Sequence, residues 1–159
     1  MRRVNLYTAD LNRDDEPAGY EHAYVKLAPL IGGATMNGGY YELPPGQANC
    51  PYHYESDEEW LLVLEGRVTV RHPGGEDTLE AGDLVCFPGG PDGAHKLTNS
   101  GDGTARMLIV STNNLPAVAV YPDSDKIGVW TGNDPDDVIF KRGTAVSWSE
   151  GEEGWHLAS

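Results

Sequence analysis

Short apolar runs separated by turn-forming residues make up most of this chain. Apolar and polar residues alternate in His22–Leu27 (HAYVKL) and Arg67–Arg71 (RVTVR), and this period of two predicts strands with one buried face. Trp60–Leu64 (WLLVL) is apolar at every position and predicts a strand that is buried on both faces. Similar runs predict further strands at Gly39–Leu43, Thr78–Glu80, Leu84–Phe87, Ala94–Thr98, Met107–Ser111, Ala117–Tyr121 and Ile127–Trp130.

The turns between these runs favour an all-β fold. The chain has 20 glycines and 11 prolines, and no segment shows the apolar period of a helix. Turn signals that recur every ~8–12 residues are typical of a sandwich or barrel of antiparallel strands. We expect one domain over residues 1–159, with its core at about 20–130, a polar surface loop at 10–20 and a C-terminal extension at 131–159. In that extension, Trp148 and Trp155 are predicted to cover local core.

The charge of the chain excludes some classes of partner. A formal charge of −14 repels phosphate backbones and anionic lipid, so we expect neither nucleic-acid binding nor binding to a membrane surface. No run reaches the ~18 apolar residues of a membrane span. The first residues, MRRVNLYTAD, lack the apolar segment of a signal peptide, so a cytoplasmic protein is expected.

One stretch concentrates residues that bind metals. His53 and Glu55 lie two residues apart and therefore face the same side of a strand. If the polar bend at 56–58 folds back as a hairpin, Glu59 comes alongside them, and His95 lies on a later strand. Buried carboxylates are costly unless they are paired or bound to a cation. The pattern predicts a site for a divalent transition metal held by two imidazoles and one or two carboxylates.

The other histidines and the cysteines are assigned differently. His22, His72 and His156 are interpreted as structural, because a lone histidine in a β protein is more often hydrogen-bonded than metal-bound. Cys50 and Cys86 form no C-x-x-C pair and are too few for a disulfide framework, so we expect reduced thiols that do not bind the metal.

Two ordered motifs resemble those of the cupin superfamily. The first, G-x5-H-x-H-x3/4-E-x6-G, is matched with one extra residue by Gly46, His53, Glu55, Glu59 and Gly66. The second, G-x5-P-x-G-x2-H-x3-N, is matched with two extra residues by Gly82, Pro88, Gly90, His95 and Asn99. The sequence around these motifs is similar to that of small single-domain bacterial cupins, some of which are labelled sugar-phosphate isomerases. The resemblance implies a double-stranded β-helix jelly roll, often dimeric, with a metal inside the barrel.

The chain departs from this family at Glu55, which stands where the second histidine is usual. Three interpretations stay open. Glu55 is a fourth metal ligand beside His53, Glu59 and His95, or it is a free catalytic base next to a two-histidine, one-carboxylate set, or the metal site is degenerate. The metal would be Mn, Fe, Ni or Zn.

Two functions follow from these alternatives. The first is a metal-dependent isomerase or dioxygenase acting on a small oxygenated organic molecule. The second is a non-catalytic module that binds a small ligand, because fold alone does not imply activity.

A phosphorylated substrate needs a cationic clamp, and the nearby candidates are only Lys96, Arg67 and Arg71. Candidates for the pocket mouth are Tyr41, Trp60 and Phe87. An exposed sheet edge and apolar strand faces favour a homodimer.

Overall fold

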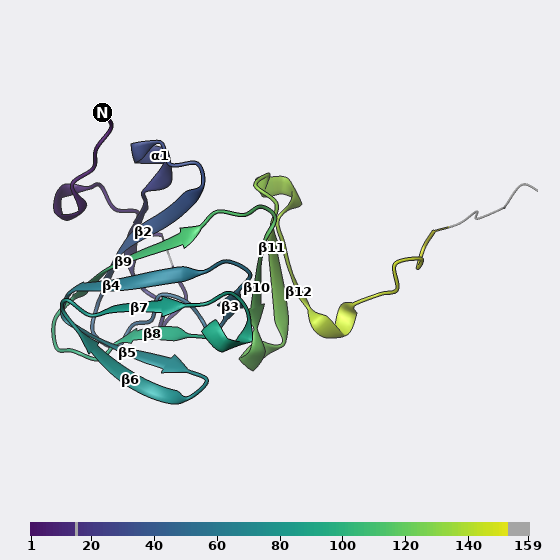
Figure 1. The fold of residues 1–159 in the computed structure, drawn as a ribbon. Coiled ribbons are helices and arrows are strands. Elements are labelled where there is room, and N and C mark those ends of the chain that lie inside the picture. Colours follow the sequence, from purple (N-terminus) through teal and green to yellow (C-terminus); the bar gives the residue numbers. More distant parts are fainter. Residues whose placement is uncertain (15, 153–159) are drawn as a thin grey trace, which may run out of the picture.

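A computed structural model describes residues 1–14 and 16–152, and it confirms the all-β fold (Figure 1). The strands are β1 (Ala23–Lys26), β2 (Met36–Leu43), β3 (Tyr54–Glu55), β4 (Glu59–Glu65), β5 (Arg67–His72), β6 (Gly75–Glu80), β7 (Leu84–Phe87), β8 (Lys96–Asn99), β9 (Ala105–Thr112), β10 (Ala117–Tyr121), β11 (Lys126–Trp130) and β12 (Val138–Lys141). The helical segments are α1 (Ala28–Ile31) and five 3₁₀ turns, η1 (Leu6–Thr8), η2 (Pro91–Gly93), η3 (Pro122–Ser124), η4 (Asp134–Asp136) and η5 (Arg142–Thr144). In this part of the chain, no helix has the length and apolar character needed to cross a membrane.

The strands form three antiparallel sheets. The first has the order β1-β2-β9-β4-β7, the second β6-β5-β8, and the third β12-β11-β10-β3. Inward side chains of the first two sheets make the core, since each strand alternates between a buried and an outer face. The main core residues are Leu61 and Val63 of β4, Val68 and Val70 of β5, Leu97 of β8, and Met107 and Ile109 of β9. The third sheet stands beside this barrel (Figure 1).

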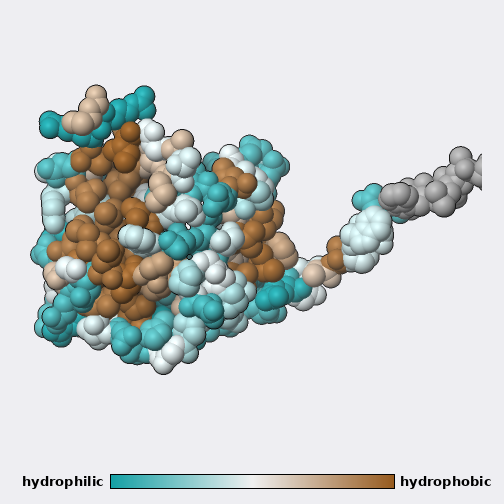
Figure 2. Space-filling view, in the orientation of Figure 1, coloured by the Kyte–Doolittle hydropathy of each residue, from teal (hydrophilic) through white to brown (hydrophobic). Residues whose placement is uncertain are grey.

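The prediction that Trp60–Leu64 is buried on both faces is wrong. Leu61 and Val63 are fully buried, but Trp60 is 45% exposed and Leu62 is half-buried. The reason is that no other layer of the described chain covers the outer face of the five-stranded sheet at β4. Figure 2 shows the result as a continuous hydrophobic area over β9, β4 and β7.

The C-terminal extension also differs from its prediction. Its first part forms β12, an edge strand that is exposed at every position and pairs with β11 through its backbone. Such a strand has no buried face, so its sequence carries no alternating signal. Beyond β12 the chain runs away from the barrel (Figure 1), and Trp148 is 80% exposed, so it does not cover the core. Trp155 and His156 lie outside the described residues.

The core assignment can be tested on two leucines of opposite burial. Replacing the fully buried Leu61 by alanine should lower the free energy of unfolding by about 2–5 kcal/mol, because it leaves a cavity between the sheets. The same change at the exposed Leu115 should alter it by less than about 0.5 kcal/mol. Urea unfolding of both variants is the measurement. Equal losses would contradict this description of the core.

Candidate metal centre

The two predicted histidines lie side by side because their backbones pair directly. His53 and His95 form an isolated antiparallel bridge just before β3 and β8. The amide of His53 donates to the carbonyl of His95 at 3.0 Å, and the amide of His95 donates to the carbonyl of His53 at 2.7 Å. This reciprocal pair brings together two segments that are 42 positions apart in the chain, and it sets the imidazole centroids 4.8 Å apart.

Both imidazoles are oriented in the same way. In each, Nδ1 lies 2.9 Å from the carbonyl oxygen two residues earlier, at Pro51 for His53 and at Gly93 for His95. A carbonyl oxygen only accepts, so each Nδ1 carries the proton and donates it. In the neutral imidazole, Nε2 is therefore the atom with the free lone pair, which is the orientation that carbonyl partners impose on metal-binding histidines. A metal ion would replace the second proton that His53 carries in its charged form.

Gly93 makes this arrangement possible at His95. A Cβ on Gly93 would lie 1.8 Å from the carbonyl oxygen of Pro88. Only glycine therefore fits in this tight turn, whose carbonyl orients His95. Phe87 adds a second constraint, because its ring stacks on the His95 imidazole at a centroid distance of 3.8 Å.

Glu59 completes a three-residue cluster with the histidines. It begins β4, and one of its carboxylate oxygens lies 3.6 Å from Nε2 of His95. One ligand atom from each of His53, Glu59 and His95 lies within 4.8 Å of the others. In the described part of the chain, these three residues make up the group that could hold a metal ion.

Glu55 lies beside the cluster without belonging to it. Its carboxylate is 3.7 Å from Nε2 of His53. Its side chain is 28% exposed, against 13% for Glu59 and 6% for His53. The structure therefore brings three of the four predicted ligands into one cluster and sets the fourth next to one of them, nearer to solvent.

The predicted hairpin around residues 56–58 does not form. β3 pairs with β10 in the third sheet, whereas β4 pairs with β7 and β9 in the first, so the bend carries the chain from one sheet to the other. The buried carboxylate of Asp57 fixes this bend by accepting hydrogen bonds from Thr112 and Asn114. Glu55 and Glu59 thus approach the histidines from different sheets.

Burial and neighbouring charges shift the titration of the cluster. Burial lowers the pKa of His53, but hydrogen bonds with the Cys50 thiol and the Glu55 carboxylate more than offset this and raise it to about 11. Burial and the nearby His53 lower the pKa of His95 to about 4. Burial and the charge of Glu55 raise the pKa of Glu59 to about 7. The two imidazoles therefore do not carry charge together, as is expected of like charges that share a small space.

A cavity of about 250 Å³ opens onto this cluster. It contains Glu55 and also residues that the sequence pattern did not identify: Glu16, His22, Tyr24, Asn49, Cys50 and Ile109. His22 is interpreted as structural from the sequence, and its Nδ1 is indeed 2.7 Å from the carbonyl oxygen of Tyr20. Its ring also lines the cavity. Glu16 comes from the segment predicted to be a surface loop. If the pairing of β1 with β2 were known, Tyr24 could be assigned to the cavity, because it lies opposite Tyr41 in that pair.

The three aromatic candidates for the mouth have different positions. Tyr41 lines the cavity. Trp60 lies on the outer face of the sheet, so its assignment to the mouth is wrong. Phe87 packs behind His95 and lines a separate cavity of about 210 Å³ on the other side. Strand parity explains this result, since Trp60 and Leu61 of β4 necessarily point to opposite faces.

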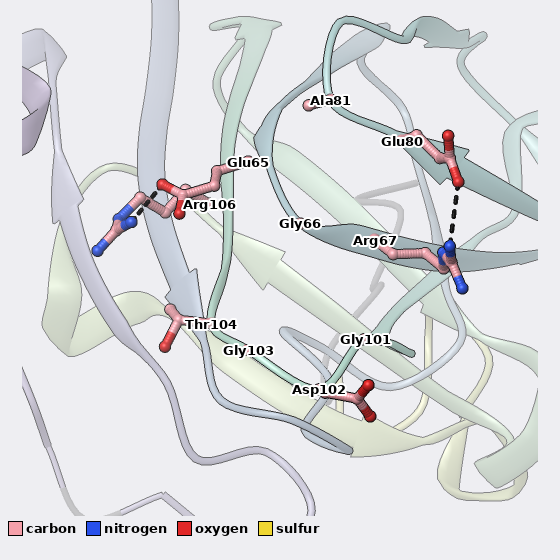
Figure 3. A pocket seen from close by; sticks show the side chains of 10 residues that line it. All are labelled: Glu65, Gly66, Arg67, Glu80, Ala81, Gly101, Asp102, Gly103, Thr104 and Arg106. Carbon is pink, nitrogen blue, oxygen red and sulfur yellow. Dashed lines mark hydrogen bonds and ion pairs between the residues drawn. The ribbon is translucent and has the colours of Figure 1, made fainter.

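A larger hollow lies at the other end of β4, where the chain turns into β5 (Figure 3). Its arginines are already paired, Arg67 with Glu80 at 3.2 Å and Arg106 with Glu65. Figure 3 shows these two ion pairs on opposite sides of an open floor made by Gly101, Asp102 and Gly103. The two cations are neutralised, so the histidine cavity is the better candidate site.

Comparison with known proteins finds one matching family. Residues 39–111 match the Cupin domain family. A structure from Silicibacter pomeroyi, named a sugar phosphate isomerase from the cupin superfamily, aligns with a TM-score of 0.78 and 21% identity over 90% of this chain and 94% of that one. The polyketide cyclase RemF from Streptomyces resistomycificus aligns with a TM-score of 0.61 and 24% identity over 74% and 83% of the two chains. Less than half of the chain is thus similar to the Cupin domain family, and the fold is the predicted jelly roll.

Sequence relatives cover less of the molecule. The tetracenomycin polyketide synthase protein TcmJ from Streptomyces glaucescens is 30% identical over 83 residues, which are 52% of this chain and 54% of TcmJ. The chain spans about half the length of the curated relatives it matches. The structures at this level of identity show the fold alone.

The donor set fits a divalent transition metal. Two imidazoles that can each present Nε2 and the partly buried Glu59 carboxylate form a two-histidine, one-carboxylate arrangement, which leaves positions open for a ligand. Cys50 and Cys86 are free thiols. Cys50 lines the cavity, but the three-residue cluster does not include it.

Metal content tests this centre. Protein purified without chelator should retain a divalent transition metal close to one per chain, and His95→Ala should reduce it at least about tenfold, since a ligand is lost. The control is His72→Ala, whose ring pairs with Asp77 at 3.0 Å, away from the cluster. Elemental analysis of the folded variants is the measurement. Metal that survives in His95→Ala would contradict the ligand set.

Proposed function

We propose that the protein is a metal-dependent enzyme acting on a small oxygenated organic molecule. His53, Glu59 and His95 would hold a divalent transition metal (Mn, Fe, Ni or Zn), and Glu55 would move a proton. The observation that carries this proposal is the matched orientation of the two imidazoles. Their Nδ1–H groups are held by backbone carbonyls, and one ligand atom from each lies within 4.8 Å of the partly buried Glu59 carboxylate.

Glu55 is assigned the role of base rather than ligand. Its carboxylate lies against His53 instead of inside the cluster, and it is the more exposed of the two carboxylates next to the histidines. It also lines the cavity into which a substrate would enter. A base needs to reach the substrate, whereas a ligand needs to reach the metal, and this position suits the first role better.

The chemistry that this arrangement favours is isomerisation by proton transfer. The metal ion would supply Lewis acidity that polarises a carbonyl or enediol oxygen of the substrate. Glu55 would remove a proton from the hydroxyl-bearing carbon beside the carbonyl carbon and return it to the former carbonyl carbon, while the hydroxyl proton passes to the former carbonyl oxygen. Cys50 lines the cavity as a thiol. Because such thiols stay reduced in the cytoplasm, we propose that the reaction takes place there. Dioxygenation and binding without chemistry are the competing outcomes.

The proposal is tested by Glu55→Gln on metal-loaded protein. Glutamine keeps the shape of the side chain but does not accept the proton, so exchange of substrate carbon-bound hydrogen with solvent deuterium should fall about 10²–10⁴-fold while metal content stays unchanged. Exchange is followed by NMR over uncharged hydroxyketones such as dihydroxyacetone. Glu58→Gln is the control, because Glu58 accepts from Trp60 away from the cavity.

Three results would contradict the assignment. Loss of metal in Glu55→Gln would make Glu55 a ligand, and undiminished exchange would remove it from catalysis. Oxygen consumption by the wild-type protein with catechol, without deuterium exchange, would replace isomerisation by dioxygenation.

We propose further that two copies associate through the outer face of the five-stranded sheet. Strand register sets two uncharged rows there, Val110–Trp60–Cys86 and Leu108–Leu62–Leu84. The chain has a formal charge of −14, so most of its surface repels a second copy. An uncharged apolar face complements itself across a twofold axis and avoids that repulsion.

A charge placed on this face tests the dimer. Leu84 is 57% exposed, and Leu84→Glu should convert the dimer to a monomer, because two buried carboxylates would face each other across the axis. Leu115→Glu, at a leucine of similar exposure outside the sheet, should leave the dimer intact. Analytical ultracentrifugation distinguishes the two masses. A monomeric wild-type protein would contradict the proposal.

A further inference from the structure

The walls of the histidine cavity carry three carboxylates and neither lysine nor arginine. Its carboxylates come from three separate segments, Glu16 from the N-terminal loop, Glu55 from β3 and Glu59 from β4. Three carboxylates outweigh the double charge of a divalent ion, so the occupied site stays negative.

Cationic side chains of the surrounding elements are engaged outside the cavity. Lys96 lies over the Tyr20 ring, 5.3 Å from its centroid, and Lys126 lies over the Tyr121 ring at 5.1 Å. Arg71 makes two hydrogen bonds to Asp123 and stacks over Tyr52. Recognition of phosphate or carboxylate relies on such groups, arginine above all, and here they are committed elsewhere.

The polar atoms of the cavity are mainly acceptors. Ionised carboxylates only accept hydrogen bonds. Asn49 also lines the cavity, and its Oδ1 is buried without a hydrogen-bond partner in the described part of the chain. A buried acceptor without a donor is costly, so a ligand that brings donors gains at this atom. Hydroxyl groups meet that need.

The shape of the cavity favours one ring. Tyr24 stacks on Tyr41 with centroids 6.1 Å apart and an interplanar angle of 21°, and His22 contacts both rings. This aromatic wall gives a flat face for a ring. At about 250 Å³ the cavity lies below the roughly 300–1,000 Å³ of pockets for drug-sized ligands.

From these features we infer that the site takes an uncharged compound with vicinal hydroxyls on a single ring, and that it rejects phosphorylated and carboxylated analogues. The carboxylates repel anions, whereas a divalent ion held by His53, Glu59 and His95 would repel an ammonium group placed directly against it. An uncharged diol avoids both and supplies the donors that Asn49 and the carboxylates lack. This inference rests on the proposed function, since it assumes an occupied metal site.

Matched ligand pairs test this preference by calorimetric titration of Mn²⁺-loaded protein without oxygen. The pairs are catechol with 3,4-dihydroxybenzoate, and ribose with ribose 5-phosphate, so aromatic and sugar diols are compared separately. In at least one pair the uncharged member should bind at least about tenfold more tightly, because like charges repel in the anionic cavity. Equal or tighter binding of both charged members would overturn the inference, as would the absence of binding by both uncharged diols.

A substitution at Glu16, which lines the cavity, tests whether the preference for uncharged ligands depends on charge. Glu16→Lys should reduce the discrimination at least about tenfold, because it replaces a repelling carboxylate by an attracting ammonium. Glu76→Lys is the control, since Glu76 is an exposed carboxylate of β6 and does not line the cavity. Unchanged discrimination in Glu16→Lys would overturn the inference. Metal content measured on the same samples separates this failure from failure of the proposed function, in which the protein would not retain Mn²⁺.

Discussion

The candidate site depends above all on the reciprocal backbone hydrogen bonds between His53 and His95. These two bonds join a segment that leads into the third sheet to one that leads into the second. In the same segments, the Nδ1 of each imidazole is held by the backbone carbonyl two residues earlier. Because backbone geometry sets both Nε2 atoms, the donor set is arranged before any ion arrives, and little reorganisation is needed to bind one.

The two carboxylates acquire different environments from one bend. Asp57, anchored by Thr112 and Asn114, sends β3 into one sheet and β4 into another. Glu59 therefore lies among buried groups opposite His95, while Glu55 stays at the cavity wall beside His53. Carboxylates placed in different surroundings take different roles, and this is how one short stretch can supply both a ligand and a base.

Much of the fold could be predicted from the sequence, because strand periodicity and two spaced motifs are local signals. The bridge between His53 and His95 could not be deduced from spacing, since it joins strands of different sheets. Trp60 shows a second limit: an all-apolar strand predicts two buried faces even where one of them is left uncovered. Glu16 and Asn49 carried no pattern, because loops bring them to the cavity without periodicity.

The account is tested most directly by X-ray absorption spectroscopy of the metal-loaded protein. It predicts a first coordination shell of nitrogen and oxygen atoms with outer-shell scattering from two imidazole rings, reduced to one ring in His53→Ala or His95→Ala. Scattering from a sulfur atom at bonding distance would make Cys50 a ligand. The absence of imidazole scattering would contradict the arrangement of His53, Glu59 and His95 as the metal-binding centre.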